Sequence, residues 1–115
     1  MNIEDLRNYC LLKKGAGESF PFDESTLVFK VEGKMFLLTD LSDDFSINIK
    51  CTPEKALELR EHYPCVKPGY HMNKKYWVTV EIDGSVGDDT LYAWIDESYR
   101  IVVAGLPGSI REKLQ

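Results

Sequence analysis

A chain of 115 residues with 43% apolar and 29% charged side chains can bury one core, so we expect a single domain over residues 1–115. No apolar run approaches the roughly 18 residues of a membrane span, and the acidic start MNIEDLRNYC is unlike a signal peptide, which together predict a cytoplasmic protein. The net charge of −5 disfavours non-specific binding to phosphates, and three cysteines without a CxxC pair disfavour a disulfide framework.

The first half of the chain predicts one helix and then three strands. Asn2 is a good N-cap for a helix that carries Leu6 and Cys10 on its inner face, and the segment KKGAGESFPF ends that helix. TLVFKVEGKMFLLTDL predicts a β-hairpin, because its apolar residues alternate on either side of Glu32-Gly33, a pair suited to a two-residue turn. FSINIKC predicts the third strand.

The second half predicts a helix, one or two strands and a longer helix. Thr52 and Pro53 are start signals for the helix in TPEKALELREHYP, and YWVTVEIDG alternates as a strand does. A helix is expected from about Asp88 or Asp89, with both aspartates as capping residues, and GSIREKL forms a terminal turn or helix. The fold class is therefore α+β, an antiparallel sheet of four or five strands in the order α-β-β-β-α-β(β)-α(α).

Four segments of the chain are distinctive when taken together and in order: FPF, LVFKVEGKMF, PGYHMNKKYW and SYRIVVAGLP. In this combination the sequence resembles the MmcQ/YjbR family of small bacterial proteins. The resemblance runs over nearly the whole chain. It implies an α+β fold of the secretion-chaperone-like or CyaY-like (frataxin-like) kind, and it implies DNA binding through a double wing of hairpins.

The segment PGYHMNKKYW is the main candidate site. In one interpretation it is a rigid turn that enters a strand, with Trp77 buried under a helix edge, Lys74 and Lys75 exposed, and His71 partly buried and hydrogen-bonded. In the other it is a concave patch in which lysines bind phosphate, Asn73 or His71 donates hydrogen bonds, and Trp77 stacks on a base. A lone histidine without a paired carboxylate or nucleophile disfavours catalysis.

Two other groups of residues are weaker candidates. Lys34 stands at the hairpin turn, the natural tip of a wing, whereas Lys30 is expected on the solvent face of its strand. We expect no cofactor, and the spacing of the potential zinc ligands disfavours a metal site; these ligands are Cys51, His62, Cys65 and His71.

The sequence thus predicts a monomeric protein that binds a partner and is not an enzyme. The family resemblance favours DNA, reached through Lys34 and residues 67–77, while the net charge of −5 disfavours DNA and suits a module that binds a protein partner through its sheet and helix faces. A small-ligand site near Trp77 and His71 is the third alternative. A continuous positive stripe through the four lysines would favour nucleic acid, and a broken stripe would favour the alternatives; these lysines are Lys34, Lys67, Lys74 and Lys75.

Overall fold

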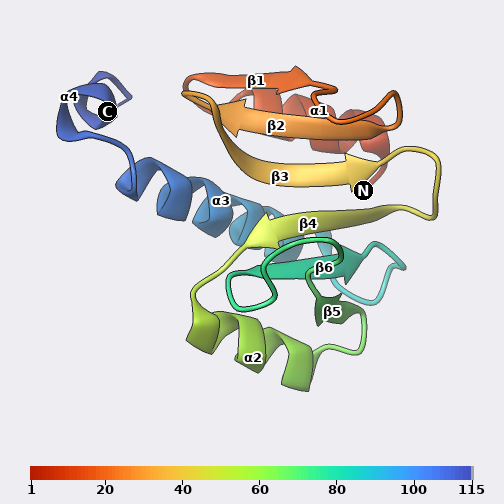
Figure 1. Ribbon diagram of the computed structural model, residues 1–115. Helices are drawn as coiled ribbons and strands as arrows, with labels where there is room; N and C mark the ends of the chain where they lie inside the picture. Colours follow the sequence, from red (N-terminus) through yellow and green to blue (C-terminus); the bar gives the residue numbers. More distant parts are fainter. Residues whose placement is uncertain (115) are drawn as a thin grey trace.

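The computed structural model describes residues 1–114, which form a six-stranded antiparallel sheet and four helices (Figure 1). The strand order is β1-β2-β3-β4-β6-β5. In chain order the elements are α1 (Ile3–Leu11), β1 (Ala16–Ser19), β2 (Thr26–Val31), β3 (Lys34–Asp40), β4 (Ser46–Lys50), α2 (Pro53–His62), β5 (Val66–Pro68), β6 (Trp77–Glu81), α3 (Asp88–Ala104) and α4 (Gly108–Lys113).

The predicted α+β class and the antiparallel sheet are confirmed. The sheet has six strands because the glycine-containing segment after α1, predicted only as a break, pairs with β2 as the edge strand β1. The two-residue turn is also confirmed, since Glu32 and Gly33 have φ angles of 50° and 77° between β2 and β3. Positive φ at both positions is the geometry whose twist suits a tight hairpin.

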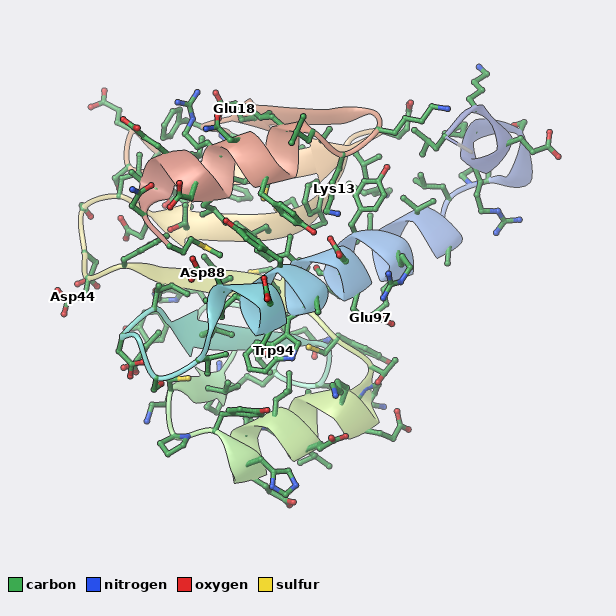
Figure 2. The ribbon with its side chains drawn as sticks, turned by 180° about the vertical axis from the view of Figure 1, so that it is seen from behind. Lys13, Glu18, Asp44, Asp88, Trp94 and Glu97 are labelled. Atoms are coloured by element: carbon green, nitrogen blue, oxygen red, sulfur yellow. The ribbon has the colours of Figure 1, made fainter. Side chains whose placement is uncertain are left out.

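Helices α1 and α3 lie behind the sheet in the view of Figure 1, and no helix of residues 1–114 covers the front face. Both α1 and α3 cover this rear face, while α2 packs beside β5 and β6. Figure 2, seen from behind, shows Trp94 of α3 directed toward α2, where its ring meets that of Tyr63 edge-on at 5.0 Å. One apolar core fills the space between the helices and the sheet, and Leu6, Phe29, Phe36 and Ile95 are fully buried in it.

The helix starts agree with the sequence at α1 and α2 and differ at α3. The side chain of Asn2 accepts a hydrogen bond from the Asp5 amide, and that of Thr52 accepts one from Lys55. The N-cap of α3 is Gly87, which makes no side-chain cap bond, so the capping role expected of Asp88 and Asp89 is wrong. Asp88 lies in the first turn instead, where its carboxylate pairs with the N-terminal amine of Met1 at 3.0 Å.

Strands β3 and β4 pair over a short length, and a side chain of α3 links their backbones further along. In the paired part Leu37 lies opposite Ile49, and Leu38 lies opposite Asn48. Beyond it, the fully buried Ser98 hydroxyl of α3 accepts a hydrogen bond from the Lys50 amide at 2.8 Å and donates one to the Phe36 carbonyl at 2.5 Å. One buried side chain thereby satisfies two backbone groups, one from each strand. None of the helices over residues 1–114 is long and apolar enough to span a membrane.

Candidate functional site

The helix-free face of the sheet is built from alternate residues of β2, β3, β4 and β6. Because successive side chains of a strand point to opposite faces, the neighbours of the core residues Val78 and Val80 point away from the helices. These neighbours are Trp77, Thr79 and Glu81, as expected from the alternation of the sequence. They lie beside Lys50, Asn48 and Ser46 of β4, respectively.

Trp77 is buried on this helix-free face. It is 7% exposed and forms a second, small apolar cluster with Val28 and Leu38, against which Met35 and Met72 pack. The expected burial is therefore confirmed, but its expected place under a helix edge is wrong. Instead of a helix, the loop between β5 and β6 lies over this face, in front of β6 (Figure 1).

Backbone contacts hold that loop against β6. A Cβ atom on Gly69 would stand 2.8 Å from both Cβ and the carbonyl oxygen of Trp77, so only glycine allows this close approach. The Gly69 amide donates to that same oxygen at 3.1 Å, and the Tyr70 amide donates to the hydroxyl of Thr79 at 2.9 Å. The Lys74 ammonium donates to the Gly69 carbonyl at 3.2 Å. Segment 68–77 is thus a turn that is held in place by hydrogen bonds and leads into a strand.

His71 differs from its prediction. It is exposed, its φ is 58°, and its ring meets that of Tyr70 edge-on at 4.3 Å. Within residues 1–114 no hydrogen bond of the His71 ring is found, so the expected partly buried, hydrogen-bonded histidine is wrong. The expected exposure of Lys74 and Lys75 is confirmed, and Asn73 uses its side-chain oxygen to accept the Lys75 amide.

A hollow of about 1000 Å³ lies on this face, between the β5–β6 loop and the β1–β2 loop. Its floor includes Leu38, Asn48 and Thr79, and the hydroxyl of Thr79 donates to the side-chain oxygen of Asn48. The exposed rings of Phe22 and Tyr70 line it from the two loops. We call it the acidic hollow, because its lining includes six carboxylates, those of Asp23, Asp40, Asp43, Asp44, Glu81 and Asp83.

The acidic hollow holds the whole net charge of the chain. Besides the six carboxylates its lining has one lysine, Lys67, and His71. Subtracting these from the 19 acidic and 14 basic residues of the chain leaves 13 of each sign, so the remainder is formally neutral. All five ion pairs found in residues 1–114 use carboxylates outside the hollow. Lys67 offsets one of the six charges, and in the described part of the chain none of these carboxylates forms an ion pair, so the negative charge here is concentrated.

Short hydrogen-bonded turns hold three of these carboxylates in the charged form. The backbone amide of Thr26 lowers the pKa of Asp23 below its ordinary value. The hydroxyl of Ser42 does the same to the pKa of Asp40, and the hydroxyl of Ser85 to the pKa of Asp83. Hydrogen bonds to an ionised carboxylate favour that form. Asp43 and Asp44 line the hollow from the loop between β3 and β4, and Figure 2 shows Asp44 at the outer tip of that loop.

Lysines gather at the opposite end of the same strands, and we call this region the lysine end. Lys34 begins β3 at the hairpin turn, Lys30 lies beside Met35, and Lys50 ends β4 with its ammonium 6.0 Å from the centre of the Trp77 ring. The carbonyl oxygen of Tyr76 accepts a hydrogen bond from the Cys51 amide just after β4. This bond holds the loop with Lys74 and Lys75 at the same end. The lysine end comprises Lys30, Lys34, Lys50, Lys74 and Lys75.

The predicted site residues therefore fall into two places. Lys34, Lys74 and Lys75 belong to the lysine end, whereas Lys67, paired in register with Thr79, lies in the acidic hollow with His71. The four lysines do not form a continuous positive stripe, because Lys67 lies among carboxylates and apart from the other three. The carboxylates of the hollow were not predicted from the sequence.

The cysteines and histidines do not converge. Residues 1–114 contain no group of three cysteine, histidine or acidic side chains placed to hold a metal ion. Cys10, Cys51 and Cys65 are buried free thiols. Burial raises the pKa of Cys10 to about 12 and that of Cys51 to about 11, which keeps both protonated and poorly nucleophilic near neutral pH.

Comparison with known proteins defines the family. The YjbR family model matches residues 11–101 of this chain. The chain belongs to the YjbR family. It is 36% identical over 115 residues to protein YjbR of Escherichia coli K12, an alignment that covers 99% of this chain and 98% of that protein. It is 41% identical over 88 residues to protein YbdF of Escherichia coli O157:H7, covering 76% and 72% of the two chains.

Solved structures of this kind share the fold. The crystal structure of Deinococcus radiodurans protein DR2400 superposes with a TM-score of 0.93 at 40% identity, covering 98% of this chain and 87% of that one. A crystal structure of a Pseudomonas syringae protein gives a TM-score of 0.76 at 25% identity, covering 88% and 98%. The names of these relatives specify no ligand or reaction, so the similarity defines the family and the fold alone.

Proposed function

We propose that this YjbR-family protein is a binding module, not an enzyme, and that its ligand is a cationic molecule held in the acidic hollow. The observation that carries the proposal is the location of the chain's whole net charge in one concavity on the helix-free face. A concave surface with apolar walls and a few polar groups is the usual form of a binding site. Lined by carboxylates, it attracts cations and repels phosphates.

The chemistry of the face supports binding over catalysis. The thiols of Cys10 and Cys51 lie in the core and are protonated, and His71 has no hydrogen-bonded carboxylate partner in residues 1–114. General acid–base and nucleophilic catalysis both use a positioned partner for the reacting group. Asp23, Asp40 and Asp83 of the hollow accept hydrogen bonds from amides and hydroxyls of their own turns, which keeps them ionised and suits them to attracting a cation.

Calorimetric titration with spermine, a flexible polyamine, tests the proposal. We expect saturable binding at low salt that weakens as salt is raised to about 0.15 M, because screening shortens the reach of exposed charges. The double variant Asp40→Asn/Glu81→Gln should weaken it about tenfold, since each exposed ion pair contributes roughly 0.2–1 kcal/mol. The asparagine retains the side-chain oxygen that binds Ser42, so the fold is preserved.

A matched variant separates local charge from total charge. Glu61→Gln/Glu112→Gln removes the same formal charge from α2 and α4, outside the hollow. It should leave spermine affinity within about twofold of the parent. Equal loss of affinity in the two double variants, or no binding of spermine to the parent at low salt, would overturn the proposal.

Nucleic acid at the lysine end is the second candidate. One observation favours it: five lysines gather at the end of the sheet away from the hollow, and the net negative charge lies elsewhere. The overall charge of −5 therefore does not describe the surface that DNA would meet. This is the place where the wing expected from the family resemblance would make phosphate contacts.

Salt-dependent DNA binding tests this second candidate. If DNA binds there, Lys74→Ala/Lys75→Ala should weaken binding to all sequences alike and lower the salt slope by up to about two, because each phosphate contact releases roughly one counterion. Lys67→Ala is the control, since Lys67 lies in the acidic hollow and should leave DNA binding unchanged. Unaltered binding by the double variant would exclude the lysine end.

A further inference from the structure

We infer that the occupant of the acidic hollow is an extended, arginine-rich segment of a partner protein, laid across the strands. The inference rests on the proposed function and specifies its ligand. Three features of the hollow distinguish such a segment from a small cation: its width, the separation of its carboxylates, and the aromatic rings on its two sides.

The hollow is wide in the direction across the strands. Its lining includes residues from five consecutive strands of the sheet, from Thr26 of β2 to Lys67 of β5. Four intervals between neighbouring strands span about 19 Å. An extended chain covers this distance in about six residues. A compact cation would occupy only part of that length.

The carboxylates are spread along this width. Asp23 lies on the β2 side, Asp40 and Asp44 lie near the β3–β4 loop, and Glu81 and Asp83 lie at the end of β6. In residues 1–114 no three acidic, cysteine or histidine side chains are placed to share one metal ion. A row of separate negative charges complements several cationic side chains at intervals, not a single ion.

Exposed aromatic rings stand at the two sides. Phe22 is 64% exposed in the β1–β2 loop, and Tyr70 is 69% exposed in the β5–β6 loop, which is tied down through its amide to Thr79. Exposed aromatic faces near carboxylates suit the guanidinium group, which stacks on rings while it pairs with acids. Arginine therefore fits both kinds of group in the hollow better than lysine or an aliphatic amine.

The test compares three probes by calorimetry under the same salt conditions. They are a blocked peptide of about six residues rich in arginine, the same peptide with lysine in place of arginine, and spermine, all of equal formal charge. We expect the arginine peptide to bind about tenfold more tightly than spermine, with the lysine peptide between them. Each measurement is repeated on Phe22→Ser/Tyr70→Ser, which removes two exposed rings and leaves the core intact.

The outcomes separate this inference from the function on which it rests. The ring variant should lose most of the advantage of the arginine peptide while its spermine affinity stays the same. If spermine binds as tightly as the arginine peptide, or the ring variant weakens all probes alike, the inference is overturned and cation binding stands. If no probe binds the parent, both are overturned.

Discussion

Ile95→Asp is expected to leave the protein largely unfolded at neutral pH. Ile95 is fully buried on the inner face of α3, in the core between the helices and the sheet. Loss of its side chain alone costs about 2–5 kcal/mol, and a buried carboxylate without a partner adds a desolvation cost of several more. Since domains have a total stability of about 5–15 kcal/mol, the sum removes most or all of it. Urea titration followed by circular dichroism measures the loss.

The pH dependence of this variant identifies the buried charge as the cause. Burial raises the pKa of a carboxyl group in the folded state, so the charge penalty grows as pH rises above the unfolded value of about 3.9. Ile95→Asp should therefore regain stability relative to the parent as pH falls toward 4, whereas Ile95→Asn should not. Ile95→Val, the conservative control, should cost only about 0.5–1.5 kcal/mol. A folded Ile95→Asp protein with unchanged melting temperature would contradict the placement of α3.

The elements that the sequence predicted are those with local signals. The hairpin around Glu32-Gly33 and the helix after Thr52 each have turn or cap residues that act over a few positions. Strand β1 lacks such a signal, because Ala16–Ser19 is rich in small and polar residues and becomes a strand only by pairing with β2. The irregularity in register after Phe29 also has no local signal. It places the neighbours Phe36 and Leu37 both in the core and so breaks the alternation of β3.

The candidate site was predicted in part for a related reason. PGYHMNKKYW is continuous, so its turn and its buried tryptophan could be recognised from ten residues. The carboxylates of the hollow come from separate loops and strand ends, such as Asp23 before β2, Asp40 at the end of β3 and Asp83 after β6. Antiparallel pairing brings these positions to one end of the sheet and the lysines to the other. That separation of charge requires the strand order, which local patterns do not contain.

Trp77→Ala is expected to destabilise the protein by about 3–5 kcal/mol, the usual cost of deleting a buried aromatic side chain. Trp77 is 7% exposed and packs with Val28 and Leu38, and the backbone of Gly69 lies directly against it. Its removal takes away the support of the β5–β6 loop, so Tyr70 should lose its fixed place at the hollow as well. Thermal and urea unfolding measure the first effect, and hydrogen exchange at the amide of Tyr70 measures the second.

Trp77→Phe is the matched variant, and it decides between burial and stacking as the role of this residue. Phenylalanine keeps an aromatic ring in the cluster, so most of the stability should return, with a remaining cost of about 1–2 kcal/mol for the lost volume. An exposed stacking platform predicts the opposite pattern, in which Trp77→Ala melts like the parent and loses only DNA binding. Trp77 lies toward the lysine end, with the Lys50 ammonium over its ring, but it is only 7% exposed and belongs to a cluster against which Met35 and Met72 pack. Any nucleic acid at that end must therefore be bound through the lysines, not by stacking on Trp77.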